Sequence, residues 1–254
     1  MHIIKLHIQG SNVGCDEFFE HIEYYFHSLY QSTQITNEEW QYEPIENGVS
    51  VNLYCPEQDS FHSTNSTIYA NRWKAQLEDE FMCTFNFNYV GVDPSAGNIL
   101  IPESPRFLIL KMGRYSPLID GDSCEPIPLY KIPDTHHNGK GYNNINFWEN
   151  NYKRVRELWF NGAVGESWCQ AQLQEHDSEL SEQGIDCAKK IEEVTKLPTY
   201  YFLFNYREET EETGRQRKCP GCGGDWMLEE KIVDDLYAFK CDACRLVAMK
   251  SSNT

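Results

Sequence analysis

Apolar and polar residues alternate over residues 3–8 (IIKLHI), and this period of two predicts a β-strand. Ile4, Leu6 and Ile8 would form its buried face. From Asp16 the spacing of apolar residues changes to three and four, which predicts an amphipathic helix with Asp16 as its N-cap. The buried face of that helix would carry Phe18, Ile22, Tyr25, Phe26 and Leu29.

The same two periods recur up to about residue 92. Asn47-Gly48 separates two strand-like runs as a hairpin turn would, and residues 66–79 have helical spacing. Residues 83–92 (CTFNFNYVGV) alternate again, with one face formed by Cys83, Phe85, Phe87 and Tyr89. The order β-α-β-β-α-β predicts a ferredoxin-like α+β domain over residues 1–92. RNA binders, enzymes and scaffold proteins share that fold, so it indicates no function.

The pattern over residues 93–206 is mixed and rich in helices. Residues 106–112 (RFLILKM) and 127–133 (IPLYKIP) predict strands, and the segment between them is rich in turn-forming residues. Helical spacing follows over residues 148–159, 168–175 and 186–196, and residues 198–206 (PTYYFLFNY) predict an apolar strand. We therefore expect a mixed α/β, mostly helical domain over residues 93–206.

Two C-x-x-C pairs lie near the C-terminus, and 18 residues separate them: Cys219, Cys222, Cys241 and Cys244. This is the spacing of a tetrahedral zinc site with four thiolate ligands. The residues between the pairs have room for a β-hairpin. The spacing predicts a zinc ribbon over residues 215–254 that holds one structural Zn²⁺, joined to the preceding domain by an acidic linker over residues 207–214. A thioredoxin-type redox role is a poorer interpretation, because no βαβ pattern surrounds either pair.

Other groups of reactive residues do not make a convincing active site. His136 and His137 lie on a polar loop that contains Asn-Gly, with no carboxylate or cysteine at a telling distance. A divalent cation could be bound by the turn that contains Asp120, Asp122, Cys124 and Glu125, but the same residues suit an ordinary acidic turn. Cys124 has no recognisable partner for nucleophilic catalysis. We therefore expect a protein that is not an enzyme and has no catalytic residues.

Composition narrows the class of protein. The chain has 254 residues with 15 Tyr, 13 Phe and 6 Trp, which excludes a disordered acidic tail. It has no apolar run long enough for a transmembrane helix, and its first residues lack the apolar core of a signal peptide. The six cysteines outside the two pairs are scattered. A reducing, cytoplasmic location is therefore the simpler expectation.

The formal net charge is −17, and the charge is unevenly distributed. Residues 1–206 contain 14 basic and 29 acidic residues, whereas residues 214–254 contain 7 and 6. An acidic body repels nucleic-acid phosphates and attracts basic partners. The ribbon itself has basic residues around its aromatic residues, an arrangement that could contact nucleic acid. The basic residues are Arg215, Arg217, Lys218, Lys231, Lys240 and Arg245, and the aromatic ones are Trp226, Tyr237 and Phe239. Packing of the small ribbon core explains the aromatic residues more simply.

The stretches PLYKIP (128–133), LWFNGAVGES (158–167), DSELSEQG (177–184) and PTYYFLF (198–204) resemble a bacterial family of unknown function. The resemblance runs from about Ser116 to Cys244. The description of that family gives a C-terminal zinc ribbon and nucleic-acid binding as a candidate function. The ribbon cysteines match the family residue by residue, and the family offers no catalytic residues. Some members resemble immunity proteins encoded beside Rhs-type polymorphic toxins of type VI secretion systems.

Charge and resemblance together predict a cytoplasmic, non-enzymatic binding protein. Its expected partner is a basic protein, in particular a toxin domain that this immunity protein would neutralise by covering the active surface. The alternative is a nucleic-acid-associated protein that uses the basic rim of the ribbon. The structural expectation is an α+β chain with a ferredoxin-like βαββαβ domain, a mostly helical middle domain and a C-terminal four-cysteine zinc ribbon.

Overall fold

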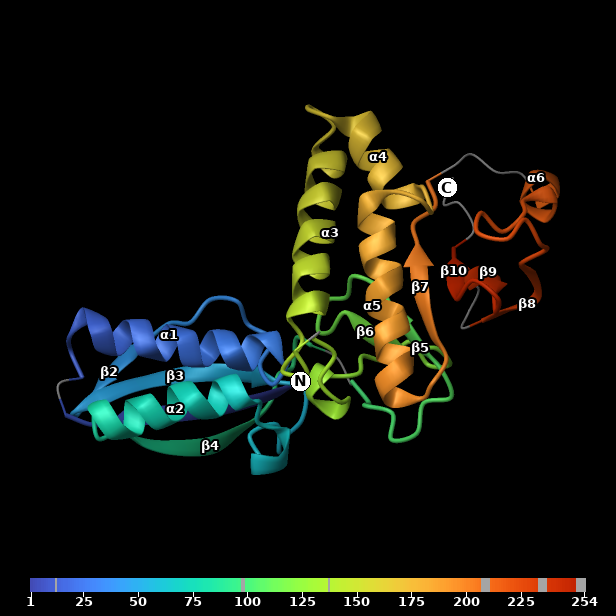
Figure 1. Cartoon of the computed structure of the whole chain (residues 1–254). Coiled ribbons are helices and arrows are strands. Elements are labelled where there is room, and N and C mark those ends of the chain that lie inside the picture. Colours follow the sequence, from blue (N-terminus) through green and yellow to red (C-terminus); the bar gives the residue numbers. More distant parts are fainter. Residues whose placement is uncertain (12, 97–98, 137, 207–210, 233–236, 250–254) are drawn as a thin grey trace. The chain divides into compact units, whose positions relative to one another are not determined.

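The structure, a computed structural model, describes residues 1–11, 13–96, 99–136, 138–206, 211–232 and 237–249. The chain is a mixed α+β protein with two compact units, each built around its own β-sheet (Figure 1). The first unit comprises Met1–Ile101 with Pro128–Asn143, and the second comprises Pro102–Ile127 with Asn144–Thr254.

The first unit contains a four-stranded sheet in which every neighbouring pair is antiparallel. The strand order is β2-β3-β1-β4, for β1 (His2–Gln9), β2 (Glu43–Ile45), β3 (Gly48–Cys55) and β4 (Thr84–Val92). Helices α1 (Asp16–Gln31) and α2 (Ile68–Glu80) contribute to the same core as the sheet. That core includes Ile4, Leu6 and Ile8, as their alternation predicts, together with the predicted face of α1.

Local differences from the predicted elements of this unit have simple causes. Asp16 is the first residue of α1 and does not cap it, because Cys15 occupies the N-cap position in an extended conformation. The strand predicted over residues 127–133 is wrong: Leu129–Lys131 forms the 3₁₀ helix η2. A first 3₁₀ helix of the same length, η1 (Ser63–Asn65), lies earlier in the unit. Pro128 has no N–H group for a ladder, and its carbonyl instead accepts from the N–H of Lys131.

The second unit contains a six-stranded mixed sheet with the order β6-β5-β7-β10-β9-β8. Its strands are β5 (Leu108–Leu110), β6 (Leu118–Asp120), β7 (Thr199–Leu203), β8 (Met227–Ile232), β9 (Tyr237–Cys241) and β10 (Leu246–Ala248). Strand β7 is parallel to both of its neighbours, β5 and β10, and all five of its residues are buried. Continuous apolar character is typical of such a central parallel strand, as the aromatic run in the sequence indicates.

Helices α3 (Asn143–Asn161), α4 (Glu166–Gln174) and α5 (Glu179–Thr195) also belong to this unit, and α5 packs on β7 (Figure 1). Helix α5 begins seven residues before the predicted helix at 186–196. Ser178 provides the start signal, since its side chain accepts a hydrogen bond from the N–H of Ser181. Strand β6 lies in a segment that the sequence indicated as a turn, and β5 lies within the predicted strand at 106–112.

The predicted ribbon contains the expected antiparallel hairpin, formed by β8 and β9. The predicted boundaries at 207–214 and 215–254 imply a separate ribbon module. However, the strands of the ribbon belong to the six-stranded sheet of the second unit. Strand β10 lies between β9 and β7, and its residues Leu246 and Val247 pair with Tyr201 and Phe202. The short helix α6 (Glu211–Gln216) begins in the predicted linker and ends two residues inside the predicted ribbon. The ribbon therefore completes the sheet of the second unit.

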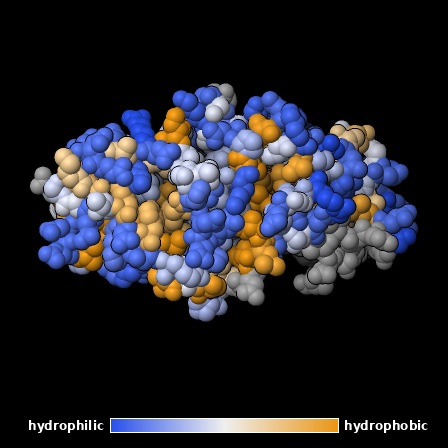
Figure 2. Space-filling view, turned by 90° about the horizontal axis from the view of Figure 1, so that it is seen from below, coloured by the Kyte–Doolittle hydropathy of each residue, from blue (hydrophilic) through white to orange (hydrophobic). Residues whose placement is uncertain are grey.

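No helix in the described part of the chain is long and apolar enough to cross a membrane. Figure 2 shows a face on which hydrophilic residues are widespread and apolar residues gather in smaller groups between them.

Candidate metal centre

The four ribbon cysteines converge on one point. Their Sγ atoms all lie within 4.8 Å of one another, and the Sγ atoms of Cys222 and Cys241 are 3.7 Å apart. Four sulfurs at about 2.3 Å from a tetrahedral ion are about 3.8 Å from each other. The cluster Cys219, Cys222, Cys241 and Cys244 thus has the size and the donor set of a four-thiolate metal site. Among the described residues, this is the one such group of potential ligands.

The first cysteine pair lies on a tight turn in which glycines are required. The N–H of Gly223 donates to the carbonyl of Cys219 at 2.8 Å, and Gly223 adopts a left-handed conformation with φ of 71°. A Cβ atom on Gly221 would lie only 2.8 Å from the Sγ of Cys244. The glycines of the CPGCGG sequence therefore let the two cysteine pairs approach each other.

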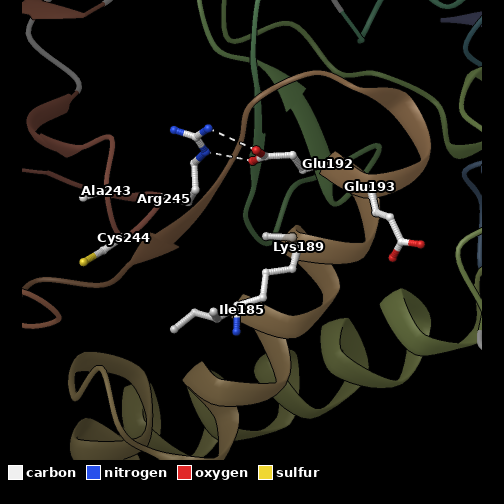
Figure 3. Close-up of a pocket in the computed structure, with 8 residues that line it drawn as sticks. Ile185, Lys189, Glu192, Glu193, Ala243, Cys244 and Arg245 are labelled. Carbon is white, nitrogen blue, oxygen red and sulfur yellow. Dashed lines mark hydrogen bonds and ion pairs between the residues drawn. The ribbon is translucent and has the colours of Figure 1, made fainter.

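The second cysteine pair uses an arginine where the first uses a glycine. Arg245 follows Cys244 as Gly223 follows Cys222, and it too is left-handed, with φ of 53°. A residue with a Cβ atom pays about 1 kcal/mol for this conformation. The guanidinium of Arg245 donates to both carboxylate oxygens of Glu192 on α5, at 2.8 and 3.0 Å (Figure 3). This bidentate pair holds the turn in place.

The ion pair also affects the titration of Glu192. The hydrogen bond from Arg245 lowers the pKa of the Glu192 carboxyl below its ordinary value. Beside the pair lies a cleft of about 370 Å³, between α5 and the turn of the second cysteine pair (Figure 3). Glu192 gave no signal in the sequence, because it lies 53 residues away from Arg245.

The thiols themselves have unequal environments. Burial raises the pKa of Cys219 and of Cys244. Cys222 is exposed, and the backbone N–H of Gly224 stabilises its thiolate and lowers its pKa to about 7. A metal that binds all four thiolates must therefore displace protons from Cys219 and Cys244.

The aromatic residues of the ribbon pack its core, as the simpler interpretation predicts. Trp226 and Phe239 are buried, with ring centroids 5.1 Å apart. The guanidinium of Arg217 lies over both rings, at 5.1 and 5.0 Å from their centroids. Tyr237 is also buried and contacts Phe202 of β7.

Several basic residues of the predicted nucleic-acid rim have partners within the second unit. Lys218 forms an ion pair with Asp225, and Lys240 forms one with Asp242. The ammonium of Lys240 also lies 4.6 Å from the ring centroid of Tyr200. Arg245 is held by Glu192 and Arg217 by the two aromatic rings. Arg215 is exposed, and the side chain of Lys231 lies outside the described residues.

The side chains of Asp120 and Asp122 in the acidic turn have nearby protein partners. One carboxylate oxygen of Asp120 accepts from the N–H and the hydroxyl of Ser123, at 2.8 and 2.6 Å, and Asp122 forms an ion pair with Arg106. Burial raises the pKa of the Cys124 thiol, which is the reverse of what a nucleophile needs. The structure thus has the ordinary turn and not a converging set of cation ligands.

The predicted histidine pair is only partly described. His136 contacts Asn138 at 2.7 Å in a local turn, and the described residues bring no cluster of metal ligands to it. His137 lies outside the described residues.

Two family models match the chain from residue 103 onward. A domain of unknown function, DUF2310, covers residues 103–204, and a second one, DUF8594, covers residues 208–254. Two proteins of Haemophilus influenzae, each described only as an uncharacterized protein, are similar over most of their length. One is 33% identical over 210 residues, which is 81% of this chain and 79% of the relative. The other is 35% identical over 171 residues, which is 66% of this chain and 82% of the relative.

The chain belongs to the same bacterial family as these two proteins. No solved structure matches it. The match to DUF2310 ends just after β7 and the match to DUF8594 begins before α6, so one continuous sheet contains strands from both domains of this family member. The four cysteines all lie within the DUF8594 region.

Proposed function

We propose that this family member is a non-enzymatic immunity protein that neutralises a basic toxin domain by covering its active surface. The observation that carries the proposal is an acidic stretch of the second unit. From Glu157 to Ala188 the chain has seven acidic residues and no lysine or arginine. Such a surface speeds encounter with a basic partner and disfavours phosphate backbones.

The same stretch exposes apolar side chains that could anchor an interface. Phe160, Val164 and Trp168 surround the connection from α3 to α4 and are 79%, 72% and 56% exposed. The carboxylate of Glu166 lies in the first turn of α4, and those of Glu179 and Glu182 lie in the first turn of α5. An exposed tryptophan with a polar rim is the usual composition of an interface hot spot. We name this set of side chains the α3–α4 tip.

The metal in this proposal is one Zn²⁺ with a structural role. Four cysteine ligands leave no open position for a substrate or for a reactive water, in contrast to catalytic zinc sites. The zinc would hold the two cysteine turns together and so fix β9 and β10 in the sheet. We further propose that the first unit is a ferredoxin-like domain, which its antiparallel strand order supports, and that the protein acts in the cytoplasm.

The nucleic-acid alternative has less support. Ion pairs and ring contacts within the second unit engage Arg217, Lys218, Lys240 and Arg245. Binding of RNA or DNA with a steep salt dependence, lost on replacing Arg215, Arg217 and Lys218, would favour this alternative over the immunity function.

Co-expression tests the proposed function. The gene product encoded beside this protein should be toxic when expressed alone, and this chain should restore growth. Trp168→Ala together with Glu179→Lys and Glu182→Lys should abolish the rescue without loss of folding. Phe147→Ala is the matched control, because Phe147 is a comparably exposed residue of α3 outside the tip, at 65% exposure. Failure of the unaltered chain to rescue growth would reject the function, whereas rescue by the triple variant would reject only the tip.

A further inference from the structure

The two edges of the four-stranded sheet in the first unit are very different. Strand β2 has three residues, and its exposed Glu43 and Pro44 are features that discourage pairing with another strand. Strand β4, at the opposite edge, has nine residues and contains no proline and no charged residue. The edge at β2 is thus protected against pairing with another strand, whereas the edge at β4 is long and uncharged.

The outer edge of β4 has backbone N–H and C=O groups that can pair with a further strand. Strand β4 pairs with β1 on one side, and no backbone group in the described part of the chain pairs with its other side. Its pairing with β1 is regular from Thr84 to Tyr89, and the register shifts only beyond Tyr89. These six residues therefore form a regular edge to which a further antiparallel strand can be added.

Apolar exposure concentrates beside this edge. Tyr89, Val90 and Val92 are 46%, 59% and 54% exposed, and Met82, just before the strand, is 68% exposed. Pairing of β4 with a further strand would remove part of these side chains from water, as strand addition does in peptide recognition.

We propose that the free edge of β4 pairs with β4 of a second copy of this chain, antiparallel and about a two-fold axis at Phe87. The sequence of β4 fits its own copy in this register. Phe87 would face its counterpart and Phe85 would face Tyr89, while Asn86 would face Asn88 on the other side of the sheet. Aromatic pairs and amide pairs of this kind stabilise neighbouring strands.

Charge selects a second copy over a basic partner as the occupant. Residues 81–92 contain no Asp, Glu, Lys or Arg, so the edge offers a basic strand no opposite charge. In a chain with a net charge of −17, an uncharged edge is also where two copies meet with the least repulsion. Pairing of the two edges gives a closed, isologous contact and a continuous eight-stranded sheet.

Sedimentation velocity of the full-length chain over a concentration series tests this contact. The unaltered chain should form a dimer. Asn86→Lys with Asn88→Lys puts like charges opposite each other twice across the axis and should weaken the dimer about tenfold or more. Asn86→Lys with Asn88→Asp puts opposite charges in the same places and should keep it.

Asn52→Lys is the control, since Asn52 is exposed on the interior strand β3 and should leave dimerisation unchanged. Circular dichroism must show that each variant is folded. The proposal is overturned if the unaltered chain is monomeric throughout, or if the double-lysine variant dimerises as well as the unaltered chain. Loss of the dimer in both double variants would overturn the register at Phe87. All these measurements are independent of toxin binding.

Discussion

At the scale of single residues, the candidate metal centre depends on positions where small size or an unusual backbone conformation is required. Gly221 lies against the Sγ of Cys244, and Gly223 takes the left-handed turn. Arg245 takes the same turn with a full side chain, and its ion pair with Glu192 offsets the cost. Both cysteine turns therefore need a left-handed residue after the second cysteine. The first turn has a glycine there, and the second has an arginine held by an ion pair.

Gly221→Ala should weaken metal binding. Its Cβ atom would lie 2.8 Å from the Sγ of Cys244, so one turn must move, at about 1–3 kcal/mol. Zinc affinity measured by competition with a chromophoric chelator should fall about tenfold or more. Gly224→Ala is the control, because its Cβ atom would make an ordinary contact at 3.5 Å. Equal affinities of the two variants would contradict this account of the turn.

Glu192→Gln should destabilise the second unit by about 1 kcal/mol, because it removes the charge of a partly exposed bidentate pair. Urea unfolding of the metal-loaded protein measures the change. A double-mutant cycle with Arg245→Ala should give a coupling free energy of the same size. No coupling between the two residues would mean that Arg245 keeps its conformation without Glu192.

At the scale of elements, helix α5 packs closely against strand β7 in the second unit. Gly184 lies within α5, where a Cβ atom would meet a ring carbon of Tyr201 at 2.1 Å and Nε1 of Trp148 at 2.5 Å. The glycine weakens the helix by itself but allows the helix to lie directly on the sheet.

Gly184→Ala should destabilise the protein by about 1–3 kcal/mol in thermal or urea unfolding, although alanine favours helices. Gly214→Ala in α6 is the matched control. Its Cβ atom would approach only the Phe239 ring, at 3.8 Å, so the higher helix propensity of alanine should leave stability unchanged or slightly increased. If Gly184→Ala also stabilised the protein, the close approach of α5 to β7 would be wrong.

At the scale of the whole molecule, the candidate metal centre belongs to the second unit. Strand β10 follows directly after the second cysteine pair and covers one side of β7, while the other side of β7 pairs with β5. Loss of the metal would therefore affect more than the residues that follow Cys219. The first unit has a separate sheet and a separate core.

Removal of the metal by a chelator, or Cys219→Ser with Cys222→Ser, should expose β7 and β10 and leave the first unit folded. Hydrogen exchange with mass spectrometry should show loss of amide protection in Thr199–Leu203 and Leu246–Ala248. Protection in β1 and β3 should not change, which serves as an internal control. Unchanged protection of β7 would show that the sheet of the second unit holds together without its metal-bound edge.

The sequence by itself determined the features that depend on local order. Period-two and period-three-to-four patterns predicted β1, α1 and β4, because alternate burial leaves a direct trace in the chain. Asn47-Gly48 predicted the hairpin of β2 and β3. The two C-x-x-C pairs predicted the four-cysteine cluster, because each turn brings its own two sulfurs together. The strand wrongly predicted at 127–133 shows the limit of this reasoning. Pro128 and Pro133 lie among the apolar residues of that segment, and a proline has no N–H group to donate to a neighbouring strand.

Only the tertiary structure decided how distant segments combine. The pairing of β10 with β7 joins residues more than forty positions apart, and the salt bridge from Arg245 to Glu192 joins residues 53 positions apart. No local period encodes such contacts, because they depend on which hydrophobic faces remain to be covered once the helices and strands have formed. The same reason explains why the sequence predicts a zinc ribbon but not its place in a larger sheet.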